Sequence, residues 1–218
     1  MKVSEIHKLV TFQLQSIFMV DSQEADLLDE ETIRIAVSNT QRCLVGSGNK
    51  YYIKQDSING ESGISLYNSV MYCILLYWLS RELFQNGKLE LADKVYYLNK
   101  MLNAVELFYE VKLPAIWSCE HPLGSVMGRA DYGDYFFFYQ GCTVGGNFRR
   151  NGKIVYLTIG HHVKMFSNSK ILGGSHIGNH VIISANSYIK DQDVPDDTIV
   201  FGQSPNLVFK ENFLKIRK

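Results

Sequence analysis

Residues 159–189 read IGHHVKMFSNSKILGGSHIGNHVIISANSYI, and an apolar residue stands at every sixth position of this stretch. These positions are filled without a gap by Ile159, Met165, Ile171, Ile177, Ile183 and Ile189. A small or β-branched residue follows four places after most of them: Val163, Ser169, Ser175, Val181 and Ser187. A period of six fits neither an α-helix nor an alternating β-strand. It predicts a hexapeptide repeat, in which each unit forms one side of a triangular coil and the apolar residue points inward.

Three such units make a coil of about 18 residues, and successive coils stack at the strand spacing of about 4.8 Å. The repeat therefore predicts a left-handed parallel β-helix. A looser version continues upstream, with apolar residues at Val126, Tyr132, Phe138 and Val144. The distance from Val144 to Ile159 is not a multiple of six, so we expect the polar stretch 147–153 to form a loop at one corner of the coil.

Residues 1 to about 112 carry the period of α-helices instead. Apolar residues recur at three- and four-residue spacing over residues 3–20, and further helices are expected over 30–45, 66–85 and 88–108, with a polar connection at 55–63. The helix at 66–85 is apolar almost all round, which indicates burial by neighbouring helices or by a partner subunit. We therefore expect an α+β protein with a helical bundle at residues 1–112 and a β-helix at residues 113–218.

Composition excludes several classes of function. The chain has 218 residues with 22 Lys and Arg against 22 Asp and Glu, and this balance argues against nucleic-acid binding, which needs a basic surface. The best apolar run, residues 70–79, has about half the length of a membrane span. The four cysteines lie far apart without a C-x-x-C pair, which is typical of reduced thiols. We expect a cytoplasmic protein without a membrane span.

Three further segments carry motifs: residues 80–92 (SRELFQNGKLELA), residues 120–124 (EHPLG) and residues 139–146 (YQGCTVGG). In this order and at this spacing they resemble the serine acetyltransferase family of hexapeptide-repeat acyltransferases. Residues 120–124 stand where that family has its Asp-His-x-x-Gly catalytic motif. The resemblance covers about residues 66–210. It implies acetyl-CoA as the cosubstrate and a homotrimer with active sites between neighbouring prisms, and the apolar helix at residues 70–79 could pair two trimers.

The catalytic residues are expected around the second motif. Transfer of an acetyl group to a hydroxyl needs a base that takes the hydroxyl proton as the oxygen attacks the thioester. His121 suits this role because imidazole titrates near neutral pH. The resemblance places its acidic partner fifteen residues earlier, at Glu106, with Glu110 as the nearby alternative. Glu120, in the place of the family's Asp, would face the acceptor.

The resemblance also implies residues that bind the cosubstrate. The backbone amides at Gly145 and Gly146 could donate to the thioester oxygen, where side chains would be in the way; outside this context they would be ordinary turn glycines. Further contacts with coenzyme A are implied at Ser169, Val181 and Lys210. Arg149 and Tyr156 are expected to contact the acceptor.

The chain departs from the family just before its final coils. The family carries an arginine and a His-Pro pair that help to hold serine, whereas residues 155–157 are Val-Tyr-Leu. A sugar needs a flat apolar surface and scattered hydrogen-bonding groups, which Tyr156, Glu120 and Arg149 could supply. We therefore expect a sugar hydroxyl of surface-polysaccharide synthesis as the acceptor. The alternatives are serine, as in cysteine biosynthesis, a sugar amine, and a non-catalytic β-helix scaffold, which would need no base.

Four histidines invite a metal hypothesis: His161, His162, His176 and His180. His162 and His180 are one coil apart in the sequence, so they should stack one above the other, and imidazoles at this spacing can bind a metal. No carboxylate or third histidine is evident at the same height. We therefore expect no metal, and a histidine ladder that faces coenzyme A or a neighbouring subunit.

Overall fold

The computed structural model describes residues 1–52, 63–148 and 152–213. The chain divides into two compact units: Met1–Asn103 with Leu107–Glu110, and Ala104–Glu106 with Val111–Lys218. Within the described residues, all helices belong to the first unit and all strands to the second. The polar connection expected at 55–63 lies, up to residue 62, outside the described residues.

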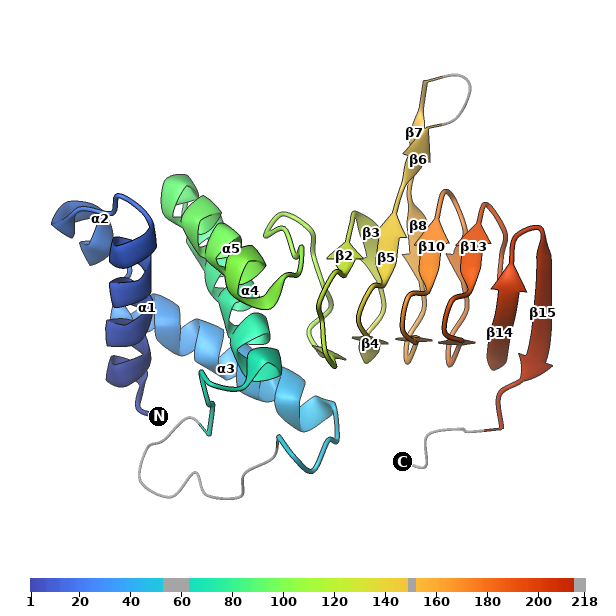
Figure 1. The fold of residues 1–218 in the computed structure, drawn as a ribbon, viewed down its shortest axis with the longest axis horizontal. Helices are drawn as coiled ribbons and strands as arrows, with labels where there is room; N and C mark the ends of the chain where they lie inside the picture. The colour runs from blue at the N-terminus through green and yellow to red at the C-terminus, as the bar shows by residue number, and fades with distance from the viewer. Residues whose placement is uncertain (53–62, 149–151, 214–218) are drawn as a thin grey trace. The chain divides into compact units, whose positions relative to one another are not determined.

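The first unit contains the helices α1 (Val3–Ile17), α2 (Ser22–Asp26), α3 (Glu30–Gly46), α4 (Ser69–Gln85) and α5 (Leu89–Asn103) (Figure 1). α4 packs against both α3 and α5, and every residue from Val70 to Tyr77 is buried. Neighbouring helices therefore account for its apolar surface on all sides. Asn68 caps its first turn, because its Oδ1 accepts hydrogen bonds from the backbone N–H groups of Val70 and Met71 at 3.0 and 3.1 Å. No helix in the described part of the chain is long and apolar enough to cross a membrane.

α5 ends at Asn103, five residues before the end expected from the sequence. Ala104 has a left-handed backbone with a φ of +49°, which stops the helix. Two residues later, Glu106 pairs in parallel with Val126 of the second unit. The apolar residues Val105 and Leu107, which prolong the helical pattern in the sequence, are buried in extended chain instead.

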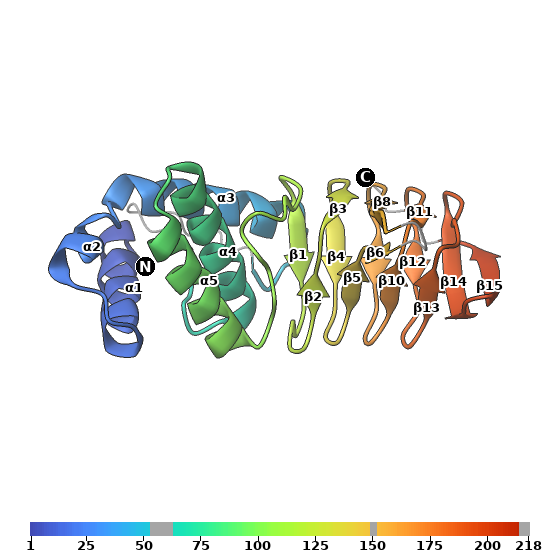
Figure 2. The ribbon, with the colours of Figure 1, turned by 90° about the horizontal axis from the view of Figure 1, so that it is seen from above.

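The second unit is a left-handed parallel β-helix with three sides (Figure 2). The first side consists of β1 (Trp117–Cys119), β4 (Phe136–Phe138), β9 (Lys164–Met165), β12 (Ile182–Ile183) and β14 (Thr198–Gln203). The second side consists of β2 (Val126–Met127), β5 (Thr143–Gly145), β10 (Lys170–Leu172) and β13 (Tyr188–Lys190). The third side consists of β3 (Ala130–Tyr132), β8 (Leu157–Ile159) and β11 (His176–Ile177). β15 (Asn206–Glu211) pairs antiparallel with β14 and ends the stack.

The corners of this β-helix are named by the sides that they join. The first corner joins the first and second sides, the second corner joins the second and third sides, and the third corner leads back to the first side of the next coil. The six apolar residues of the repeat fill the interior, none more than 3% exposed. Ile159 pairs with Ile177, and Ile171 with Ile189, each one coil of 18 residues later. The repeat predicted from the sequence is confirmed.

The upstream register differs by one residue at its start. Val126 was expected to point inward, but it pairs with Thr143, while Met127 pairs with Val144 and is the buried residue. This coil is 17 residues long, so counting back from Val144 in steps of six reaches one position too far.

A hairpin accounts for the change of phase between Val144 and Ile159. Val144 pairs with Ile171, 27 residues later, so this coil holds nine residues more than a coil of 18. The extra residues form the antiparallel strands β6 (Asn147–Phe148) and β7 (Ile154–Val155), which project from the second corner (Figure 1). The loop expected at 147–153 is therefore present and, on both sides of the undescribed residues 149–151, takes the form of a β-ribbon.

Candidate active site

His121 lies at the first corner of the β-helix, where β1 turns into β2. Cys119 and Met127 are eight residues apart on this coil, while their partners Phe138 and Val144 on the next coil are six apart. The corner that holds His121 therefore carries two extra residues. His121 is exposed, and its backbone is left-handed with a φ of +49°. The extra length places His121 outside the stacked repeat and leaves its imidazole accessible.

The lengthened corner is fixed at both ends. The backbone N–H of Glu120 donates to the carbonyl oxygen of Phe138 at 3.0 Å, and that of Gly124 donates to Ala104 at 2.7 Å. The hydroxyl of Ser125 donates to the carbonyl oxygen of Tyr139 at 2.8 Å. Bonds to the coils on either side thus hold the backbone before and after His121, as a preorganised catalytic group requires.

Glu106 lies beside the end of this corner. Its backbone N–H donates to the carbonyl oxygen of Ser125 at 2.9 Å, and its own carbonyl oxygen accepts from Met127 N–H at 3.1 Å. Glu110, the alternative partner for His121, belongs to the helical unit and is exposed. Of the two glutamates, Glu106 is therefore the one that the β-helix itself holds next to the His121 corner.

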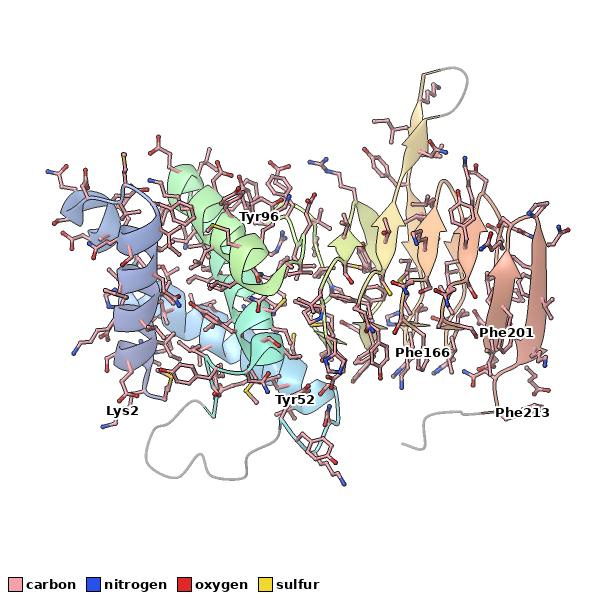
Figure 3. The ribbon with its side chains drawn as sticks, viewed as in Figure 1. Lys2, Tyr52, Tyr96, Phe166, Phe201 and Phe213 are labelled. Atoms are coloured by element: carbon pink, nitrogen blue, oxygen red, sulfur yellow. The ribbon has the colours of Figure 1, made fainter. Side chains whose placement is uncertain are left out.

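Glu120 begins an aromatic column on the outer surface of the first side. The column continues one residue per coil through Tyr139, Phe166, Ser184 and Phe201. The rings of Tyr139 and Phe166 are stacked with their centres 5.2 Å apart. Figure 3 shows Phe166 and Phe201 along the same edge of the β-helix. Glu120 is half-buried at the end of this column, so its carboxylate borders an apolar surface.

Gly146 and Tyr156 meet at the second corner, at the base of the hairpin. A Cβ atom added to Gly146 would lie 2.7 Å from the carbonyl oxygen of Val155 and 3.1 Å from Cδ1 of Tyr156. Only glycine therefore fits while the returning strand β7 keeps its place. Tyr156 is 50% exposed and covers this glycine. Arg149, expected to contact the acceptor, lies outside the described residues.

The expected catalytic groups form two clusters within one chain. Glu106, Glu120 and His121 gather around the first corner, whereas Gly145, Gly146 and Tyr156 lie at the second corner. The whole width of the second side, with strands β2, β5, β10 and β13, separates the two corners. One chain does not bring its own His121 next to its own Gly145 and Gly146.

The structure corrects the expectation that the side chains of Ser169 and Val181 bind coenzyme A. Both are 0% exposed and occupy interior positions of the coils. The Oγ atom of Ser169 lies 3.6 Å from the Sγ atom of Cys142, and burial raises the pKa of that thiol. Only backbone atoms of Ser169 and Val181 remain available to a ligand. Lys210 is exposed on β15, with Nζ 5.4 Å from the centre of the Phe201 ring.

Two curated proteins place this site in a family. No protein-family model matches the chain. The serine acetyltransferase of Synechococcus elongatus is 33% identical over 115 residues, which are 52% of this chain and 46% of that protein. The serine acetyltransferase of Staphylococcus epidermidis is 30% identical over 142 residues, 65% of this chain and 66% of that protein. The chain belongs to the serine acetyltransferase-like family of hexapeptide-repeat acyltransferases. It spans about half the length of the first of these relatives and about two thirds of the second.

Solved structures of serine acetyltransferases share the fold of this family member. The enzyme of Neisseria gonorrhoeae superposes with a TM-score of 0.67 at 21% identity, covering 86% of this chain and 71% of that one. A serine acetyltransferase in complex with CoA gives a TM-score of 0.63 at 18% identity, covering 85% and 75% of the two chains.

The histidine ladder of this acyltransferase-family chain lies at the third corner. The rings of Tyr135, His162 and His180 stack nearly parallel, with centres 4.3 and 4.8 Å apart. The predicted stacking of His162 over His180 is confirmed. A metal ligand must direct the lone pair in its ring plane at the ion, and parallel rings do not converge on one point. Among the described residues, no three His, Cys, Asp or Glu side chains form a group that could hold a metal ion.

Comparison of motifs with the serine acetyltransferase family gave no reason to single out Arg129. This residue is exposed at the second corner, one coil before Gly145 and Gly146. The preceding Gly128 donates its N–H to the carbonyl oxygen of Val144 at 2.8 Å. The signal in the sequence is the spacing: Gly128 precedes Gly145 by 17 residues, the length of this coil. Counting in coils would therefore have placed Arg129 beside Gly146.

Proposed function

We propose that the protein is an acetyl-CoA-dependent O-acetyltransferase of the serine acetyltransferase type. The observation that carries this proposal is the lengthened first corner, which keeps His121 exposed and fixed at both ends next to Glu106. A scaffold protein has no use for an accessible imidazole on an otherwise regular repeat. Membership of the acyltransferase family supplies the donor, acetyl-CoA, and the chemistry, which is attack of a hydroxyl on a thioester.

In this proposal His121 acts as the general base. One ring nitrogen takes the proton of the acceptor hydroxyl as its oxygen attacks the thioester carbonyl carbon. When the tetrahedral intermediate collapses, the carbon–sulfur bond breaks and the imidazolium returns the proton to the leaving thiolate of coenzyme A. Glu106 would accept a hydrogen bond from the other ring nitrogen and stabilise the imidazolium.

The backbone N–H groups at Gly145 and Gly146 would stabilise the negative charge on the thioester oxygen. Such donors are effective when they are fixed before the reaction begins. Support comes from the close contact of Gly146 with Val155 and Tyr156, which leaves this backbone little freedom.

A complete site would then need two chains. The two corners that carry the catalytic groups flank the second side of each β-helix. If three copies turn their second sides toward a common three-fold axis, the first corner of one copy meets the second corner of its neighbour. We therefore propose a homotrimer with shared active sites. Further pairing of trimers through the helical units stays a prediction.

Serine is the acceptor that the family relationship favours. The sequence analysis expected a sugar hydroxyl of surface-polysaccharide synthesis, on the absence of the family's His-Pro pair at residues 156–157. The proteins most similar to the chain are serine acetyltransferases, and one of the similar structures is a complex with serine. Glu120 could pair with the ammonium group of serine. A sugar hydroxyl and a sugar amine remain the competing acceptors.

The test is release of the coenzyme A thiol from acetyl-CoA in the presence of L-serine, L-homoserine or a panel of nucleotide sugars. We expect the highest kcat/KM with L-serine and O-acetylserine as the product in mass spectrometry. His121→Asn is the control for enzyme-independent transfer. A higher kcat/KM for a sugar would assign the protein to polysaccharide modification. Transfer to none of these acceptors would contradict the proposed activity.

A further inference from the structure

A serine acceptor needs a cationic partner for its carboxylate, because a charged group that enters a closed site without a partner is costly. The family's residues for this task are absent at 155–157, where the chain has Val-Tyr-Leu. Val155 and Leu157 carry no charge, and the phenol of Tyr156 offers at most a neutral hydrogen bond. The carboxylate partner must therefore come from another part of the chain.

The second corner presents such a group at the right height. Gly128 lies so close to the next coil that an added Cβ would be 2.5 Å from the carbonyl oxygen of Val144 and 3.4 Å from Cα of Gly145. Tyr132 holds the same peptide, because its hydroxyl donates to the carbonyl oxygen of Gly128 at 2.7 Å. Arg129, the next residue, therefore has a fixed backbone one coil away from the proposed thioester-binding amides.

The chemistry of Arg129 fits a carboxylate. A guanidinium stays charged at all relevant pH values and presents a planar pair of N–H donors that matches the two oxygens of a carboxylate. Its long side chain can span one coil spacing of about 4.8 Å. Exposure of Arg129 keeps it accessible from solvent before the acceptor binds.

We infer that Arg129 binds the carboxylate of the acceptor amino acid and so determines the preference for serine over uncharged hydroxyl compounds. This inference rests on the proposed function. It places the carboxylate at the second corner, one coil above the thioester carbonyl, while the hydroxyl faces His121 of the neighbouring chain. The arginine would act in binding and would take no part in the transfer of protons.

The experiment compares L-serine with L-serinamide, which keeps the hydroxyl and the amine but lacks the carboxylate. Full-length wild type, Arg129→Met and Arg129→Lys are assayed for thiol release from acetyl-CoA. Arg42→Met is the matched control, because Arg42 is an exposed arginine of α3 in the helical unit. Thermal unfolding of each variant checks that the fold is intact, which we expect because Arg129 lies at the surface.

We expect Arg129→Met to raise the KM for serine about 10- to 100-fold, the usual effect of losing a charge-assisted hydrogen bond, and to leave kcat/KM for serinamide unchanged. Arg129→Lys should lie between, and Arg42→Met should match the wild type. An unchanged KM for serine, or an equal loss with both substrates, would overturn the inference while the proposed function stands. If the wild type acetylated neither compound, the proposed function would fail and this inference with it.

Discussion

His121 and Gly146 illustrate two ways in which single residues define this site. His121 stands out because two extra residues take it outside the repeat. Gly146 stands out because a returning strand leaves no room for a side chain. The sequence motif located both residues. It could not show that they lie at different corners, since that depends on how the coil is closed.

Replacing His121 by Asn should abolish transfer and leave the fold and the cosubstrate site intact. Asn tolerates the left-handed backbone that His121 adopts, whereas Ala would add strain. We expect kcat to fall by about 10² to 10⁴, the usual contribution of a general base. Affinity for acetyl-CoA, measured by calorimetry, should stay near the wild-type value. Near-wild-type turnover would make His121 a structural residue.

Gly146→Ala and Gly145→Ala form a matched pair. An added Cβ at Gly146 meets backbone at 2.7 Å, so the hairpin base must shift, while at Gly145 it meets only Cδ2 of Leu172 at an ordinary 3.5 Å. We expect Gly146→Ala to lower kcat about tenfold or more by displacing an amide donor, and Gly145→Ala to have little effect. Steady-state kinetics check this. Equal losses in both variants would argue against a special role for Gly146.

At the scale of elements, local patterns were predictable and pairings between distant residues were not. The hexapeptide repeat identified the coils from Ile159 to Ile189, because each inward position recurs within one short unit. The end of α5 was missed, because the pairing of Glu106 with Val126 across 20 residues competes with the helical pattern. Ser169 and Val181 show that the repeat outweighs the family alignment, since both occupy the small interior positions that the period itself predicts.

The third-corner column predicts a dependence of stability on pH. Burial, followed by the nearby charge of His180, lowers the pKa of His162 below its usual 6.5, and His161 and Lys164 act in the same direction while Asp134 opposes them. The folded state therefore binds fewer protons than the unfolded state below about pH 6.5. The contribution of His162 is complete above that pH and is lost as the pH falls toward the lowered pKa.

His162→Asn should reduce this loss of stability in acid. Asn suits the left-handed backbone of His162, as Asn168 and Asn186 do at the first corner. Urea unfolding at pH 7.5 and pH 5.5 measures the free energy of unfolding at each pH. We expect a smaller drop between the two pH values for the variant than for the wild type, with His161→Asn, at an exposed residue of the same corner, as the control. Identical drops in wild type and variant would contradict the prediction.

For the whole molecule, the account depends on assembly. The donors at the second corner and the base at the first corner serve one reaction only if copies of the chain adjoin. Light scattering at micromolar concentration should therefore give three times the mass of the 24.9 kDa chain, or six times if trimers pair. A monomer that retains full activity under these conditions would exclude the shared site.

The most direct test of this account mixes two inactive variants within one assembly. His121→Asn lacks the base, and Gly146→Leu lacks the fixed amide donor, so each homotrimer should be inactive. Co-expressed in equal amounts, they form trimers in which about a quarter of the sites combine an intact His121 from one chain with an intact Gly146 from its neighbour. We predict that acetyl transfer recovers to about a quarter of the wild-type rate per site. No activity above that of the separate variants would contradict a site shared between chains.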